Sequence, residues 1–161
     1  MAENTLVSDS SSELSNALHE EVDIRREQAK WDSYYSSLPL VDEDDATRQF
    51  NDAFADIISE LLQTGGSVLE AGCGGGWQSL AVARRGQHQV SLLDFSKEAL
   101  NYAKRLFDRE KLEAQFIHED VFGPPESRHD LVFNAGVLEH YTLDEQVTFI
   151  RAMAGRSRRF V

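Results

Sequence analysis

The sequence is short of cysteine, of basic residues and of long apolar runs, and each shortage excludes a class of protein. Its single cysteine, Cys73, excludes an internal disulfide and a zinc site built from several cysteines, and it is typical of a reducing compartment. Lysine and arginine total 16 against 28 aspartates and glutamates, and this excess of negative charge opposes binding to nucleic acid through its phosphates. No stretch reaches the ~20 apolar residues of a membrane span, and residues 1–15 lack the basic and apolar regions of an export signal. We therefore expect a cytoplasmic protein without a membrane segment.

The chain divides into a polar start, a helical segment and a core. Residues 1–13 are rich in serine and acid and too poor in bulky apolar residues to offset the entropy of ordering, which predicts a flexible tail. Residues 14–40 combine apolar residues at helical spacing with three aromatics and end near Pro39, which predicts one or two helices. Residues 41–161 have the size and apolar content of a single folded unit.

Beyond Gly66, short apolar runs alternate with helical patterns. The runs predict strands at 68–71, 90–93, 114–117 and 131–134. Helices are predicted between them, one around residues 77–85 that Gly86 ends, and one that Ser96 caps. This alternation predicts right-handed crossovers and a mainly parallel sheet flanked by helices. The fold class is therefore α/β.

Two further helices are expected around this core, and their apolar spacing predicts the face that each one buries. The first begins at Asp44 or Asp45, and the second begins with a capping box of Thr142 and Glu145. The face of the first comprises Phe50, Ala53, Phe54, Ile57 and Leu61, and that of the second comprises Leu143, Val147, Ile150 and Ala154. The last three residues, 159–161, read as the opening of a fifth strand.

A glycine-rich turn follows the first predicted strand. It reads Glu70-Ala71-Gly72-Cys73-Gly74-Gly75-Gly76, and glycines at such a turn let a ligand approach bare backbone at the start of a helix. A structural tight turn would use the same residues, so the turn alone does not decide. Nicotinamide dinucleotide binding requires G-x-G-x-x-G/A, and neither register fits well, because Trp77 or Ser79 falls at the third small position.

The turn fits another signature, E/D-x-G-x-G-x-G, and the chain from about Trp31 onward resembles the class I S-adenosylmethionine-dependent methyltransferases. The resemblance implies a Rossmann-like fold, S-adenosylmethionine as the cofactor and no metal. It also implies a cofactor loop against the methionyl part, formed by Glu70, Gly72, Cys73, Gly74 and Gly76.

Later positions match the same family in the same order. Asp94 at the end of the second strand resembles the acid that binds the ribose, with Phe95 placed against adenine. The pair Asp120-Val121 after the third strand resembles the reader of the adenine edge. The pair Asn134-Ala135 lies in the fourth-strand motif, whose backbone faces the cofactor's amino group and methyl. An acid at a strand end also commonly caps the next helix, and this alternative stays open for Asp94 and Asp120.

Three side chains are candidates around the methyl group. His140 and Glu139 follow the fourth strand, where a general base is needed if the acceptor must lose a proton. His140 could equally cap a helix or bond backbone. The aromatic cluster that includes Tyr35 resembles the family's lid, which makes residues 14–40 a lid and Tyr35 a cofactor contact, although simple packing would use the same residues. Cys73 is expected to be buried without a nucleophilic role.

The resemblance implies direct, in-line methyl transfer to a small molecule rather than to nucleic acid. The family's sheet continues beyond the strands identified here, so we expect an incomplete C-terminal end whose exposed sheet edge recruits a second copy or a partner chain. A non-catalytic S-adenosylmethionine-binding module, or a subunit completed by a partner, is the alternative function. A nicotinamide-dependent oxidoreductase is the third.

Overall fold

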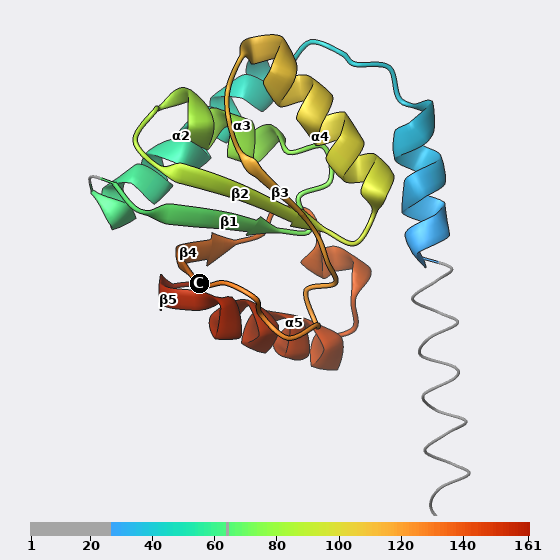
Figure 1. Ribbon diagram of the computed structural model, residues 1–161, viewed down its shortest axis with the longest axis vertical. Helices are drawn as coiled ribbons and strands as arrows, with labels where there is room; N and C mark the ends of the chain where they lie inside the picture. The colour runs from blue at the N-terminus through green and yellow to red at the C-terminus, as the bar shows by residue number, and fades with distance from the viewer. Residues whose placement is uncertain (1–26, 64) are drawn as a thin grey trace, which may run out of the picture.

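The computed structural model describes residues 27–63 and 65–161 and shows an α/β fold built on one parallel sheet (Figure 1). The strands are β1 (Ser67–Ala71), β2 (Gln89–Asp94), β3 (Gln115–His118), β4 (His129–Phe133) and β5 (Ser157–Phe160). They lie in the order β3-β2-β1-β4-β5, and neighbouring strands pair in parallel. The carboxyl ends of the strands therefore share one edge, and the strand order reverses there between β1 and β4, which is where open sheets of this kind bind ligands.

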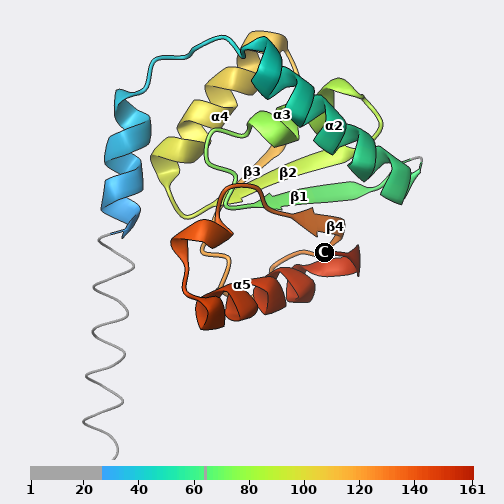
Figure 2. The same cartoon turned by 180° about the vertical axis from the view of Figure 1, so that it is seen from behind.

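Helices cover both faces of the sheet. Helices α2 (Asp45–Leu62), α3 (Trp77–Arg84) and α4 (Lys97–Glu110) lie on one face, and α5 (Leu143–Arg156) lies on the other (Figures 1 and 2). Strand residues alternate between the two cores, so that Val68 packs under α2 and α3 whereas Leu69 packs against α5. A further helix, residues 27–37, stands beside the carboxyl edge of the sheet (Figure 1).

The predicted fold class, a Rossmann-like parallel sheet flanked by helices, is confirmed. Three predicted caps are also present: Asp44 accepts from Thr47 N at 2.8 Å, Ser96 accepts from Ala99 N at 3.1 Å, and Glu145 accepts from Thr142 N at 2.7 Å. The fifth strand begins at Ser157, directly after α5, rather than at residue 159.

The predicted buried face of α2 is wrong. The side chains that α2 buries are Asn51, Ala55, Ile58 and Leu62, whereas Phe50 is 59% exposed and Ile57 is 57% exposed. Helix α2 packs against α3, where the small Ala55 permits close approach. Asn51 is tolerated in this contact because its amide donates to Glu43 Oε1 at 2.6 Å. Only Phe54 of the predicted face reaches the core, where it lies against Phe133.

The predicted buried face of α5 is wrong as well, because the helix buries a cation that an apolar pattern does not include. Helix α5 buries Phe149, Met153 and Arg156, and Leu143 is 74% exposed. Val147, Ile150 and Ala154 are exposed as well. Phe50, Phe54, Ile57 and Leu61 therefore form an apolar stripe along α2, and Leu143, Val147, Ile150 and Ala154 form a second stripe along α5.

Part of the predicted domain division falls outside the described residues. The predicted tail, residues 1–13, and the first half of the predicted lid lie there, and residues 27–37 are the part of the lid that the structure describes as helical. In the part of the chain that the structure describes, no helix combines the length and apolar character that crossing a membrane requires.

Candidate functional site

The glycine turn lies at the carboxyl edge of the sheet, between β1 and α3. Its backbone is tied to the neighbouring strand, because Gly72 N and Cys73 N both donate to Leu93 O, at 2.8 and 3.0 Å. Gly72, Gly74 and Gly76 have φ values of 73°, 50° and 74°, in the left-handed region that residues with a Cβ rarely adopt. The turn is therefore fixed at the point where the strand order reverses.

The glycines of this turn serve different contacts. A Cβ on Gly72 would meet Val137 Cγ2 at 2.7 Å, and a Cβ on Gly74 would collide with the Tyr35 hydroxyl. Both neighbours line the candidate site. A Cβ on Gly76 would instead meet Leu92 Cδ2 at 2.6 Å, inside the core. Gly76 is thus required for packing, whereas Gly72 and Gly74 line the first cavity.

Asp94 joins the two loops of the site. Its Oδ2 accepts from Gly74 N at 2.8 Å, and its Oδ1 accepts from Ser96 N at 2.8 Å. The side chain is 5% exposed, and burial, followed by the nearby charge of Asp32, raises the pKa of its carboxyl against the lowering effect of these hydrogen bonds. Asp94 is not the cap of α4, since Ser96 fills that position.

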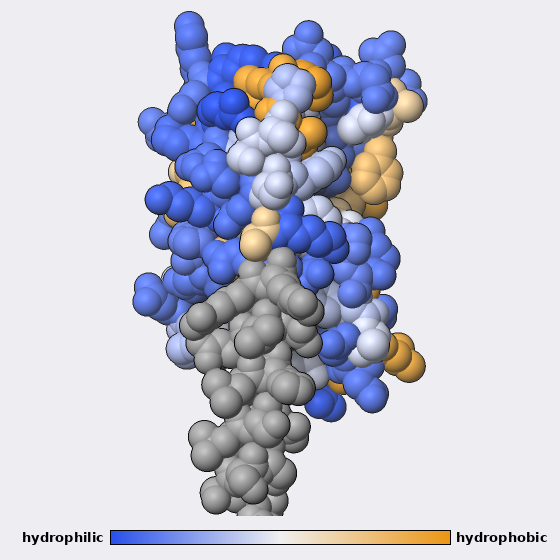
Figure 3. All heavy atoms as spheres, turned by 90° about the vertical axis from the view of Figure 1, so that its right-hand side faces the viewer, coloured by the Kyte–Doolittle hydropathy of each residue, from blue (hydrophilic) through white to orange (hydrophobic). Residues whose placement is uncertain are grey.

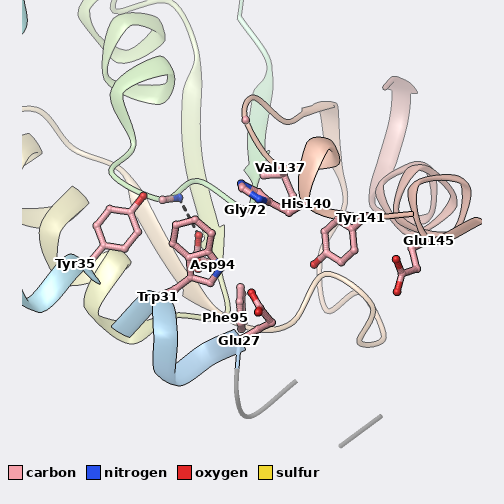
Figure 4. Close-up of a pocket in the computed structure, with 12 residues that line it drawn as sticks. Glu27, Trp31, Tyr35, Gly72, Asp94, Phe95, Val137, His140, Tyr141 and Glu145 are labelled. Atoms are coloured by element: carbon pink, nitrogen blue, oxygen red, sulfur yellow. Dashed lines mark hydrogen bonds between the residues drawn. The ribbon is translucent and has the colours of Figure 1, made fainter. Parts of the chain in front are cut away.

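Two adjoining cavities open at this edge. The residues that line both are Glu27, Gly72, Asp94, Phe95, Val137, Tyr141 and Glu145. The first, of about 290 Å³, lies under the N-terminal helix and is also lined by Trp31, Tyr35, Gly74 and His140. Figure 4 shows Trp31 and Tyr35 on one side of it and His140 and Tyr141 on the other. The second, of about 510 Å³, reaches β3 and α5, and is also lined by Asp120, Val121, Phe122 and Phe149. Their joint size suits a nucleoside joined to an amino acid.

Arg156 at the end of α5 positions the loop that carries Asp120. Arg156 is 2% exposed, and its guanidinium donates to the carbonyl oxygens of Asp120, Val121 and Gly123 at 3.1, 3.3 and 3.1 Å. It also pairs with Glu119 at 3.2 Å. A buried arginine that satisfies several carbonyls fixes a loop that has no regular structure of its own. Its position in an apolar helical pattern gave no signal of this role.

The cavities bring together eight of the predicted site residues: Tyr35, Gly72, Gly74, Asp94, Phe95, Asp120, Val121 and His140. The predicted residues outside both linings are Glu70, Cys73, Gly76, Asn134, Ala135 and Glu139. Lining residues that the sequence did not single out include Val137, Tyr141, Glu145 and Phe149. Tyr141 directly follows the fourth-strand motif, so its position in the sequence could have indicated a place in the site. Glu145 lies four residues further on and is predicted only as part of the capping box.

Glu70 lines neither cavity, and its side chain serves the core. The side chain is fully buried, and its Oε2 accepts from Ser79 N, in the first turn of α3, at 3.1 Å. Burial raises the pKa of its carboxyl to about 8, against the lowering effect of the bonds from Ser79. Glu70 therefore holds α3 against β1.

Three other predicted residues have side chains that serve elsewhere. Cys73 is buried in the core as expected, and its thiol lies 3.7 Å from Gly74 O. The Asn134 amide donates to Met153 Sδ at 3.3 Å, toward α5. Glu139 is exposed in the short 3₁₀ helix Leu138–His140. Of the two predicted bases, the cavity therefore includes His140, whose ring lies 5.3 Å from that of Trp31.

The family profile described as methyltransferase domain matches residues 68–158, more than half of the chain. The chain therefore belongs to this family. The predicted class, a class I S-adenosylmethionine-dependent methyltransferase, is confirmed, and with it S-adenosylmethionine as the cofactor of the class. The matched family gives no support to the nicotinamide alternative.

Solved structures share the fold. Magnesium protoporphyrin IX methyltransferase from Synechocystis PCC 6803, with bound S-adenosylmethionine, is 24% identical with a TM-score of 0.60, over 68% of this chain and 54% of that one. A protein studied for the conversion of a disulfide bond into a thioacetal group during echinomycin biosynthesis is 27% identical with a TM-score of 0.57, over 65% and 44%. An S-adenosylmethionine-dependent methyltransferase from Clostridium acetobutylicum ATCC 824 is 18% identical with a TM-score of 0.56, over 81% and 53%. This chain thus spans about half the length of these structures. A comparison with curated proteins finds no match.

Proposed function

We propose that the chain binds S-adenosylmethionine in the two adjoining cavities and transfers its methyl group to a small molecule. The observation that carries the proposal is the position of Asp94, whose carboxylate borders both cavities while it holds Gly74 and Ser96. A carboxylate at the end of β2, beside a glycine turn, is placed to accept hydrogen bonds from ribose hydroxyls.

The remaining binding roles follow from the two linings. Asp120, Val121 and Phe95 line the larger cavity, which suits the adenosine part, and Asp120 would accept from the exocyclic amine. Gly72 and Gly74 leave bare backbone beside the first cavity, which suits the methionyl part. Within residues 27–63 and 65–161, no group of three or more histidine, cysteine, aspartate or glutamate side chains is placed to hold a metal ion.

The cofactor supplies a methyl group on a sulfonium, which is a good leaving group. The protein then has to align the acceptor in line with the carbon–sulfur bond and exclude water. Trp31 and Tyr35 cover the first cavity, and His140 stands on its opposite wall. When bound, the cofactor would supply the methyl carbon to the acceptor's lone pair, and its sulfur would leave with the electrons of the carbon–sulfur bond. His140 takes the acceptor's proton where there is one to lose.

Methyl transfer is tested by incubating the chain with S-adenosylmethionine and a panel of small amines, thiols, phenols and carboxylic acids, and by measuring release of the demethylated cofactor. We expect release with at least one acceptor and a loss of at least about tenfold in kcat for His140→Asn, because a general base contributes factors of this size or more. His88→Asn is the matched control, because His88 directly precedes β2 at the amino end of the sheet and lines neither cavity. Cofactor binding without turnover on any acceptor would favour the alternative, a binding module or a subunit completed by a partner.

We also propose self-association through the sheet edge. Among the described strands β5 pairs only with β4. Helix α5 packs on β5 and α2 packs on β4, so we expect both apolar stripes near this edge. A twofold axis normal to the sheet would bring each stripe against its own copy, as a closed dimer requires. Arg158 and Arg159 on β5 would then approach those of the second copy, and this repulsion weakens as salt screens it.

The proposed setting is the cytoplasm, which the unpaired Cys73 supports.

A further inference from the structure

The N-terminal helix, residues 27–37, is attached to the first turn of α4 through Asp32. Asp32 Oδ1 accepts from Ser96 Oγ at 2.6 Å and lies 3.3 Å from Glu98 N, which also donates to it. The Ser96 hydroxyl in turn accepts from Ala99 N at 3.1 Å. Asp32 thus extends the cap of α4 from another element, and an anion at a helix N-terminus is favoured by the unpaired N–H groups and the helix dipole.

A second bond lies one turn earlier on the same helix. Gln28 Nε2 donates to Phe95 O at 2.8 Å, and the same carbonyl lies 3.0 Å from His118 Nε2. Gln28 and Asp32 are four residues apart, so they share one face of the helix. Both attach to the residues that directly follow Asp94.

The neighbouring face of this helix forms a wall of the site. Trp31 and Tyr35 are also four residues apart, and both line the first cavity (Figure 4). The Trp31 ring lies edge-on to His140, and the Tyr35 hydroxyl lies over Gly74. From the side of this helix the surface is mainly hydrophilic, without a broad apolar area around the helix (Figure 3). The bonds of Asp32 and Gln28 therefore fix one face of the helix, beside a face whose aromatic rings contact His140 and Tyr102.

We propose that Asp32 is a positioning residue, which fixes Trp31 and Tyr35 as the wall of the cofactor site by capping α4 from the N-terminal helix. The inference rests on the proposed function, because the wall matters only if the cavity binds the cofactor. Asp32 touches neither cavity, so it acts through the residues beside it. The negative charge of Asp32 and its acceptor oxygen both contribute to the cap of α4. Asp32→Ala removes both, whereas Asp32→Asn removes only the charge.

The fluorescence of Trp31 reports the position of this helix directly. The sequence has two tryptophans, and Trp77→Phe leaves Trp31 as the single reporter. In this background we compare acrylamide quenching of Trp31, without ligand, in the parent, Asp32→Ala, Asp32→Asn and Asp108→Ala. Asp108 is the matched control, since it lies on the same α4 and makes an exposed pair with Lys104 at 2.8 Å. Calorimetric titration with S-adenosylmethionine then gives the dissociation constant of each variant.

We expect Asp32→Ala to raise the quenching constant about twofold and to weaken S-adenosylmethionine binding about tenfold, because a charge-assisted hydrogen bond is lost. Asp32→Asn keeps an acceptor oxygen, so its quenching constant and its affinity should lie between those of the parent and of Asp32→Ala. Asp108→Ala should match the parent in both. Unfolding of Asp32→Ala would leave Asp32→Asn to carry the test. Quenching and affinity equal to the parent in a folded Asp32 variant would overturn the proposal. A parent chain that fails to bind S-adenosylmethionine would contradict the proposed function. Quenching is measured without the cofactor, so it would still test whether Asp32 positions the helix.

Discussion

Asp94 Oδ2 accepts the backbone N–H of Gly74 at 2.8 Å, so the carboxylate that closes β2 also holds the glycine turn that follows β1. A ligand that bonds to this carboxylate therefore meets a turn already in place. One residue serves both the local structure and the proposed binding of ribose.

Asp94→Ala should weaken S-adenosylmethionine binding by about 1–3 kcal/mol, the usual cost of leaving polar partners unpaired, and should also lower the melting temperature. Asp130→Ala is the matched control, because Asp130 accepts from Ser67 N and Oγ at 2.8 and 3.0 Å at the amino end of the sheet. The control should lose stability without losing affinity. Equal affinity for Asp94→Ala and the parent, measured by calorimetry, would leave Asp94 as a purely structural residue.

Gly74→Ala should abolish measurable cofactor binding while the chain still folds. The added Cβ meets the Tyr35 hydroxyl, and the φ of 50° adds strain on the order of 1 kcal/mol. Adding Tyr35→Phe removes the colliding oxygen and should restore part of the affinity. Gly86→Ala has a similar φ of 65° with no atom near its Cβ, so it should lose stability alone. A double variant no better than Gly74→Ala would show that strain, not the Tyr35 contact, sets the loss.

The buried carboxyl of Glu70 should make stability fall as pH rises. Its pKa is about 8 in the folded chain against 4.5 as the usual value, so the folded state binds more protons between these values and the stability it contributes at low pH is lost as pH rises toward 8. From pH 5.5 to 7.5 we expect a loss of about 2 kcal/mol in the free energy of unfolding from this group. Glu70→Gln keeps the acceptor for Ser79 N and should remove that slope. Parallel pH profiles for parent and variant in urea unfolding would contradict the assignment.

Self-association should strengthen with salt. Ile57→Lys places a charge on the α2 stripe and should shift sedimentation toward the monomer at every salt concentration. Val41→Lys is the control, since Val41 is 51% exposed but lies outside both stripes. A parent chain that sediments as a monomer at both low and high salt would exclude the proposed dimer.

The sequence predicted the parallel sheet, the caps and the strand-end residues well, because these depend on local patterns. Ser96 and Thr142 cap helices as their spacing requires, and Asp94 closes its strand where the motif places it. The predicted buried faces of α2 and α5 are wrong, because polar side chains are buried in them. Asn51 is buried through a hydrogen bond to Glu43, which lies outside the helix, and Arg156 is buried through hydrogen bonds to the loop after β3. The attachment of Asp32 to Ser96 likewise joins residues 64 positions apart, which no local pattern reveals.

Calorimetric titration of the unmodified chain with S-adenosylmethionine, its demethylated product and NAD tests the central claim most directly. The account predicts saturable binding of the first two, a weakening of both by Asp94→Ala, and no measurable binding of NAD. Tighter binding of NAD, or no binding of S-adenosylmethionine by a chain that melts cooperatively, would contradict it.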